Sequence, residues 1–192
     1  MARDAGWFPI GVELTTKFAE SARREFGIQV YNEKVEDIAF ADQRFDLVTL
    51  LDVYEHLQDP NAVLQAVHKT MNDDNYLLIE VPNVTFIRLK VFGLSLLFGN
   101  DAHTKHDFVN PLGYWMAQEH LYNFSDKTLQ KLLLKNGFKK RKSYIEFPSI
   151  YGAYFWRDAA QIVVWISSVV VRFVTFGYLN VGRSLVYVFM KS

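Results

Sequence analysis

The sequence contains no cysteine among its 192 residues. This absence excludes a disulfide framework, a thiolate metal site and a cysteine nucleophile, and it fits a reducing compartment. The chain also has no excess charge of either sign, because Lys plus Arg and Asp plus Glu both number 21. A balanced charge gives no support for electrostatic binding of nucleic acid. Residues 1–7 lack the apolar core of a signal peptide, so we expect a cytoplasmic protein.

Two catalytic motifs are missing as well. Without a Gly-x-Ser-x-Gly elbow a hydrolase is not supported, and without Gly-x-Gly-x-x-Gly a dehydrogenase has no positive support. What the sequence does contain is a hydrophobic fraction of 50% and an aromatic fraction of 16%. These fractions suffice for the core of one domain, which we place at residues 1–192.

The first half of the chain alternates between strand-like and helix-like segments. We expect strands over 7–13, 28–31, 47–51 and 76–81, helices over 17–26 and 61–71, and a turn at 72–75. Such alternation predicts an α/β fold with a mostly parallel sheet, right-handed crossovers and helices on both faces. The apolar run 47–51 is typical of a parallel strand that is buried on both faces.

The second half is less regular. It predicts a helix over 126–136, a strand over 142–147 and a last strand over 184–190 that pairs antiparallel. The basic run 139–142 is expected at a solvated corner between that helix and strand. Residues 84–124 are largely apolar but are punctuated by glycine and proline, and we interpret them as a lid over the strand ends.

An apolar helix is expected near the C-terminus, within residues 151–178. Its stretch 159–171 has no charged residue. At about 1.5 Å per residue this stretch is about 20 Å long, short of the roughly 30 Å hydrocarbon core of a membrane. We therefore expect the helix to pack within the domain or to contact a membrane peripherally through residues 159–176.

Residues 45–60 form the strongest candidate for a functional loop. The expected strand is followed by four closely spaced ionisable residues: Asp52, Glu55, His56 and Asp59. Asp59 followed by proline is a good helix start. In open α/β sheets ligands bind at the carboxyl ends of strands, in loops of this kind. The alternative is that these side chains only solvate a connection.

Glu13 ends the first expected strand, directly before a helix. An acid in this position suits a ribose diol, because its two oxygens can accept from two neighbouring hydroxyls. In nucleotide-binding α/β domains such an acid lies about 20 residues after a glycine-rich turn. Counting back from Glu13 runs past residue 1, so we expect the ribose-binding acid without the glycine loop.

Several short motifs occur together in one order. They are Gly-Val-Glu at 11–13, Val-Glu-Asp at 35–37, Phe-Asp at 45–46, Asp-Val-Tyr-Glu-His-Leu at 52–57, Asp-Pro at 59–60, Val-Pro-Asn at 81–83, Glu-His-Leu-Tyr-Asn-Phe-Ser at 119–125 and Asn-Gly-Phe at 136–138. In this order the chain resembles class I S-adenosylmethionine-dependent methyltransferases, with the ubiquinone-biosynthesis-like branch the nearest in character.

The resemblance implies a Rossmann-like fold and a set of cofactor contacts. Glu13 would bind the cofactor ribose, Leu14 would lie against the adenine, and Val35 and Glu36 would edge the adenine. Asp52 would lie beside the methionine part of S-adenosylmethionine.

The resemblance also implies a rim where the acceptor enters. Glu55, Asn83 and Tyr122 would bind the acceptor, and His56 and His120 are the candidate catalytic residues. His56 suits a general base because imidazole side chains ordinarily exchange protons near neutral pH, but it could equally order the start of a helix. His120 is open to the same two interpretations.

Two departures from the family pattern stand out. Lys34 occupies a position where many relatives carry an acid for the adenine amine. The family's first strand and its glycine loop have no counterpart, so we expect an N-terminally truncated enzyme. The missing strand would leave two unpaired edges, at roughly 1–3 kcal/mol for each buried unpaired peptide group. A refolded sheet that brings the two edge strands together is the alternative.

The resulting hypothesis is methyl transfer from S-adenosylmethionine to an oxygen, carbon or nitrogen of an apolar or lipid-linked acceptor, impaired in this chain. The alternative is a non-catalytic module that binds a membrane or a protein partner through the C-terminal helix. His103, His106 and Asp107 have a spacing seen in metal sites, but no metal is predicted.

Overall fold

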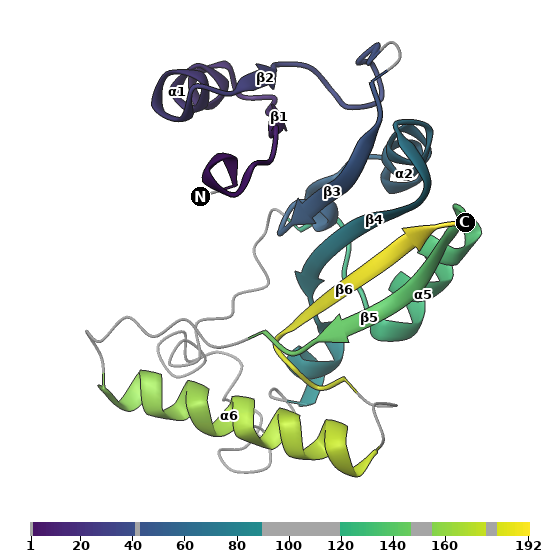
Figure 1. Ribbon diagram of the computed structural model, residues 1–192. Coiled ribbons are helices and arrows are strands. Elements are labelled where there is room, and N and C mark those ends of the chain that lie inside the picture. Colours follow the sequence, from purple (N-terminus) through teal and green to yellow (C-terminus); the bar gives the residue numbers. More distant parts are fainter. Residues whose placement is uncertain (1, 41–42, 90–119, 147–154, 176–179) are drawn as a thin grey trace.

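The computed structural model describes residues 2–40, 43–89, 120–146, 155–175 and 180–192. Its strands form two sheets, one with the order β1-β2 and one with the order β3-β4-β6-β5 (Figure 1). The pairs β1–β2 and β3–β4 are parallel, and β6 runs antiparallel to both of its neighbours. The α/β class and the antiparallel last strand are confirmed.

The first sheet and its helix form the N-terminal part of the molecule. After the 3-10 turn η1 (Arg3–Ala5) come β1 (Ile10–Val12), α1 (Thr16–Phe26) and β2 (Gln29–Tyr31). Gly27 ends α1 with a left-handed φ of 61°, which a glycine adopts without strain. The Arg23 guanidinium reaches from α1 to the Val30 carbonyl of β2 at 3.0 Å and fixes the helix on its sheet.

The central unit is β3 (Phe45–Leu51), η2 (Tyr54–His56), α2 (Pro60–Lys69) and β4 (Met71–Pro82). Asp59 caps α2 as predicted, because its carboxylate accepts from the N–H groups of Asn61 and Ala62, both at 3.0 Å. Proline is the first helical residue, where no N–H is needed. The polar loop therefore lies at the carboxyl end of β3, between a strand and a capped helix.

The turn predicted at 72–75 is wrong, because these residues belong to β4. Phe45 pairs with Met71, whereas Leu47 pairs with Tyr76, so β4 carries extra residues opposite β3 at this point. Asp74, one of these extra residues, has a left-handed φ of 64°. The polar run that signals a turn here marks a bulge inside a strand.

The C-terminal half adds α5 (Asp126–Lys135), β5 (Phe138–Tyr144) and β6 (Ser184–Lys191). The basic run 139–142 lies inside β5, so its placement at a corner is wrong. β5 is an edge strand of the larger sheet, and its residues 139–142 are exposed. Lysine and arginine suit such an edge because their charges discourage pairing with another chain.

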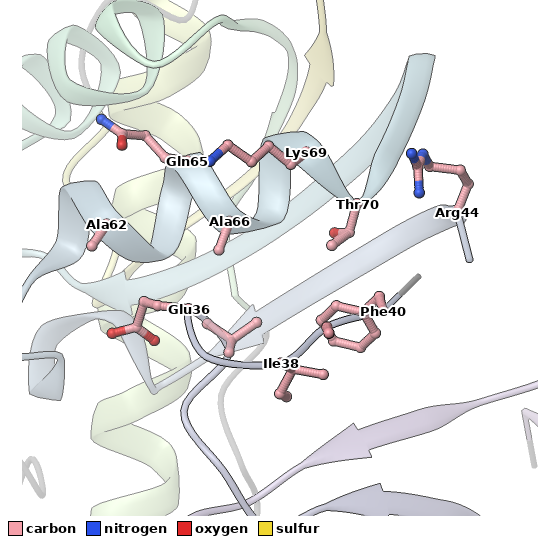
Figure 2. A pocket seen from close by; sticks show the side chains of 11 residues that line it. Glu36, Ile38, Phe40, Arg44, Ala62, Gln65, Ala66, Lys69 and Thr70 are labelled. Carbon is pink, nitrogen blue, oxygen red and sulfur yellow. The ribbon is translucent and has the colours of Figure 1, made fainter. Parts of the chain in front are cut away.

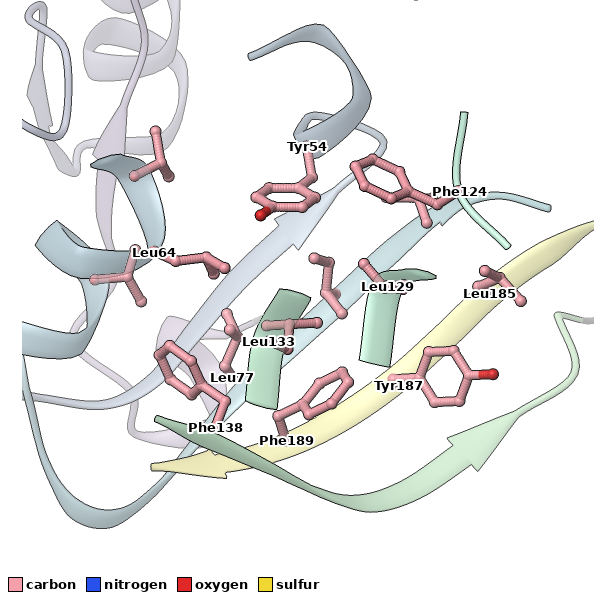
Figure 3. Close-up of a cluster of buried hydrophobic side chains, with 14 of the residues drawn as sticks. Tyr54, Leu64, Leu77, Phe124, Leu129, Leu133, Phe138, Leu185, Tyr187 and Phe189 are labelled. Carbon is pink, nitrogen blue, oxygen red and sulfur yellow. The ribbon is translucent and has the colours of Figure 1, made fainter. Parts of the chain in front are cut away.

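The core lies where α2 and α5 cover one face of the larger sheet (Figure 3). Alternate residues of β4 and β6 point into it, and two leucines of α5 cover them. The side chains buried most completely, at 0–1% exposed, include Tyr54, Leu64, Leu77, Leu129, Leu133, Phe138, Leu185, Tyr187 and Phe189.

The expected C-terminal helix is α6 (Phe155–Val174). Arg172 anchors it by donating to the Ser143 carbonyl and hydroxyl of the β5 strand, both at 2.9 Å. Within the described residues, no helix has the length and apolarity needed to cross a membrane. Most of the predicted lid, residues 90–119, lies outside the described residues.

β1 and β3 do not pair with each other in the part of the chain that the structure describes, so the alternative of a refolded sheet is wrong. One consequence concerns β3, which was expected to be buried on both faces. Leu47 is 37% exposed and Leu51 is 46% exposed. The exposed residues Leu47, Thr49 and Leu51 alternate along β3 and so share one face of the strand, and Leu47 and Thr49 line a groove there.

Candidate active site

A groove of about 1140 Å³ separates the two sheets. Residues from the β1–β2 part of the chain and from the loop after β3 line it, and several of them are candidate site residues from the sequence analysis. The residues from that analysis that line it are Glu13, Leu14, Lys34, Val35, Glu36 and His56. The acid at the end of β1 and the loop after β3 therefore face one shared hollow, which is the arrangement that a bound nucleoside needs.

Glu13 follows β1 and is held in place by local contacts. Its carboxylate accepts from the Thr15 N–H at 2.7 Å. Asn32, just after β2, donates to the carbonyls of Glu13 and Leu14 at 2.7 and 2.8 Å. These bonds fix the backbone on both sides of the carboxylate and present Leu14, which is 60% exposed, to the groove.

The loop that follows β2 supplies Val35 and Glu36. Both residues line the groove and also a second hollow of about 550 Å³ against α2. Figure 2 shows Glu36 in this second hollow, opposite Ala62 and Ala66 of α2. The loop thus forms a wall between the two hollows, so a flat ring in the groove would meet Val35 and Glu36 from one side.

The loop that follows β3, residues 52–59, forms a polar crest at the end of the strand and begins at Asp52. This residue is exposed and has a left-handed φ of 51°, a conformation that aspartate tolerates better than most residues. Its N–H donates to the Glu80 carbonyl of β4 at 3.1 Å, the last contact of the β3–β4 ladder. Asp52 itself is not among the lining residues of the groove, whereas Val53 next to it is.

Glu55 is buried beneath the crest with a side chain that is 1% exposed. Its backbone carbonyl accepts from the N–H groups of Leu121 and Tyr122 at 2.9 and 3.2 Å. Burial, followed by the nearby charge of Asp52, raises the pKa of the Glu55 carboxyl. The predicted role of Glu55 in binding an acceptor stays a prediction, and the structure places the carboxylate behind the surface of the rim.

The two candidate catalytic histidines lie side by side although 64 positions separate them in the sequence. The rings of His56 and His120 are 4.7 Å apart, edge to face. The Nε2 atoms lie 4.0 and 3.9 Å from one oxygen of Glu55. His56 is 37% exposed and His120 is 12% exposed, so His56 is the more accessible of the two to an acceptor.

Asn83 and Tyr122 have structural contacts in this region. The Asn83 amide is buried, donates to the carbonyls of Asn180 and Gly182 at 2.9 Å each, and accepts from the Thr85 N–H. The Tyr122 hydroxyl donates to the Gln58 carbonyl at 3.2 Å, and the side chain is 39% exposed. Tyr122 therefore keeps a surface for an acceptor, whereas the donors of Asn83 are used within the fold.

Glu80 was missed by the sequence analysis. It lies on β4 behind the crest, where burial, the charge of Asp52 and the charge of Glu146 raise the pKa of its carboxyl to about 7. The Ser184 hydroxyl donates to the Glu146 carboxylate at 2.7 Å. A single acid inside the apolar segment 76–81 was the available signal, because a charge in a buried strand requires a local reason.

We expect Glu80→Gln to stabilise the protein at alkaline pH. A carboxyl with a raised pKa binds its proton more tightly in the folded chain, so its stabilisation is complete below pH 4.5 and is lost as the pH rises through about 7. For a fully buried group, this shift would change the free energy of unfolding by roughly 3 kcal/mol. Glu80 is only half-buried, so we expect the variant to be more stable than the parent chain by about 1 kcal/mol at pH 8.

Urea unfolding at pH 5 and pH 8 measures this effect. Glu20→Gln on the exposed face of α1 is the matched control and should show no gain. An unchanged pH dependence in the Glu80 variant would contradict the assignment.

Comparison with known proteins decides the family. The model of the methyltransferase domain matches residues 3–143, which include every groove-lining residue except Ala2. The chain belongs to this methyltransferase family. The predicted family, its Rossmann-like fold, its enzyme class and its cofactor, S-adenosylmethionine, are thereby confirmed at the level of the family.

A ubiquinone biosynthesis O-methyltransferase from Haemophilus ducreyi is 28% identical over an alignment of 156 residues, and the match covers 69% of this chain and 66% of that protein. The chain thus spans less than two thirds of that relative, and the activity of the whole relative does not transfer directly.

Two crystal structures share the fold. A methyltransferase from Thermotoga maritima, described as a possible histamine N-methyltransferase, has a TM-score of 0.57 at 17% identity and aligns with 100% of this chain and 76% of its own. The magnesium protoporphyrin IX methyltransferase of Synechocystis PCC 6803 with bound SAH has a TM-score of 0.56 at 12% identity and aligns with 98% and 66%.

Proposed function

We propose that this chain binds S-adenosylmethionine in the groove between the sheets and transfers its methyl group to an acceptor at the rim formed by His56, His120 and Tyr122. The observation that carries the proposal is the position of Glu13 on the same groove as the loop after β3. A groove of about 1140 Å³ is large enough for a nucleoside and an acceptor group together.

The residues that would hold the cofactor fit its nucleoside end. Glu13 offers carboxylate oxygens to the ribose hydroxyls, Leu14 offers an apolar surface to the adenine, and Val35 and Glu36 bound its edge. No glycine lines the groove within the described residues, so this chain brings no bare backbone to the cofactor's amino-acid end. We therefore expect affinity to come mainly from the nucleoside.

When bound, S-adenosylmethionine supplies an activated sulfonium methyl group. The work left to the protein is alignment, exclusion of water and, for a hydroxyl acceptor, removal of a proton. The His56 imidazole is the exposed base at the rim and would take that proton as the acceptor oxygen bonds to the methyl carbon. Glu55 and His120 behind it would hold the ring in position.

An apolar or lipid-linked acceptor fits the walls of the groove. Phe8 is 96% exposed, Trp7 is 51% exposed and Val53 is 43% exposed, and all three line it. Aromatic and aliphatic side chains exposed in a concave surface favour a ligand with an apolar body.

A second candidate function rests on α6. One side of this helix exposes apolar side chains, among them Val163, Ile166, Val170, Phe173 and Val174. Phe173 is 83% exposed, although Arg172 next to it is tied to β5. Such a surface favours a module that contacts a membrane interface or an apolar partner through residues 159–176.

Calorimetry with S-adenosylhomocysteine tests the proposal, because the product shares the nucleoside. We expect saturable binding of one molecule per chain. Circular dichroism on the same sample establishes that the chain is folded. Absence of heat from a folded sample would contradict the proposed function, and co-sedimentation of that sample with anionic vesicles would then favour the second candidate.

A further inference from the structure

We propose that Glu55, His56 and His120 form a binding site for a divalent transition-metal ion, with Zn²⁺ as the best-matched ion. One ligand atom from each residue lies within 4.8 Å of the other two. The inference concerns this chain's own residues and does not depend on cofactor binding; while the ion is bound, the His56 Nε2 is a ligand and does not serve as the base at the rim. It differs from the spacing of His103, His106 and Asp107, which lies outside the described residues.

The geometry already converges on one point. One oxygen of Glu55 is 4.0 Å from the His56 Nε2 and 3.9 Å from the His120 Nε2. Zn²⁺ bonds to imidazole nitrogen and carboxylate oxygen are about 2.0–2.2 Å long, so ligands around a tetrahedral ion lie about 3.4 Å apart. Small rotations of three side chains would complete the shell, because the two oxygen–nitrogen gaps need to close by only about half an ångström and all three ligand atoms already lie within 4.8 Å of one another.

The second carboxylate oxygen of Glu55 is an independent sign. It is buried and has no hydrogen-bond partner within the described residues. A buried carboxylate oxygen without a partner is costly, because it loses its hydration without a replacement. An ion bound at Glu55 would compensate this charge at a position with 1% exposure.

The backbone holds the two halves of the site together. Glu55 and His56 are consecutive in η2, and the Glu55 carbonyl accepts from Leu121 and Tyr122 directly after His120. The loop that carries His120 is therefore tied to the turn that carries the other two ligands. Ligands fixed by backbone bonds lose little freedom when an ion binds.

The surrounding charge favours a cation. Two further acids are close in the fold: Asp52 is three residues before Glu55, and the Asp52 N–H donates to the Glu80 carbonyl at 3.1 Å. Two imidazoles and one carboxylate are a donor set typical of catalytic zinc, with a remaining position for water or an acceptor oxygen. Hard-ion sites for Mg²⁺ or Ca²⁺ use oxygen ligands instead.

The test uses the tag-free full chain, stripped with a chelator and titrated with Zn²⁺ by calorimetry. We expect one ion per chain, and Co²⁺ substitution should give a visible absorption band from a mixed nitrogen and oxygen shell. Mutating a residue that supports a metal ligand typically lowers metal affinity by about 10–100-fold. His120→Ala and Glu55→Gln change a ligand itself, so each should weaken Zn²⁺ binding by at least about 100-fold.

His68→Ala is the matched control, because His68 packs against Phe138 and is not part of this cluster. It should leave Zn²⁺ affinity unchanged. Circular dichroism checks that each variant folds, and Glu55→Gln keeps the side-chain volume. Undiminished binding in folded His120→Ala, loss of binding in a His103→Ala/His106→Ala variant, or no binding by the folded parent chain would each overturn the proposal.

Discussion

Glu13→Ala is expected to weaken the binding of S-adenosylhomocysteine by about 100-fold. The carboxylate ends β1 and lines the groove, where it can accept from both ribose hydroxyls. A hydrogen bond to a charged group is worth about 1.5–3 kcal/mol, so losing two of them costs on the order of 3 kcal/mol after water replaces part of the loss. Calorimetry or equilibrium dialysis measures the change directly.

Two further variants separate ribose binding from local structure. Glu13→Gln keeps the acceptor for the Thr15 N–H but removes the charge, and we expect a loss of about 10-fold. Glu20→Ala on α1 removes the same charge from an exposed position outside the groove and should bind like the parent chain. Equal affinities for the parent and Glu13→Ala would remove the basis for placing the ribose there.

Leu133→Ala is expected to destabilise the fold by about 3 kcal/mol. Leu133 is fully buried on α5, against the face formed by β4 and β6 (Figure 3). Removing a buried leucine side chain costs about 2–5 kcal/mol through lost burial and the cavity left behind. For a chain of this size the melting temperature should fall by roughly 6–12 °C.

The neighbouring residue provides a close control. Leu134 lies on the same turn of α5 but is 63% exposed, so Leu134→Ala makes the same chemical change on the solvent side. It should shift the unfolding free energy by less than about 0.5 kcal/mol. Similar losses in both variants would mean that α5 does not pack on the sheet in the way described.

Local chemistry in the sequence was sufficient for several elements. Asp59 and Pro60 predicted the start of α2, and Gly27 predicted the end of α1, because capping and left-handed geometry depend on a few neighbouring residues. The apolar strand before Asp52 and the capped helix after it likewise predicted a ligand-binding loop, because a strand, a loop and a helix start can be recognised from a few neighbouring residues. The errors occurred where neighbours in space decide, as in the bulge at 72–75 and the basic edge strand 139–142.

The sequence by itself determined the alternation of strands and helices, the capped loop after β3 and the family to which the chain belongs. Only the tertiary structure decided that His120 meets His56 over a buried Glu55, and that Glu13 faces the loop after β3 across one groove. The physical reason is range: caps and turns act over a few residues, whereas these side chains meet only after sheet pairing and core packing bring distant segments together.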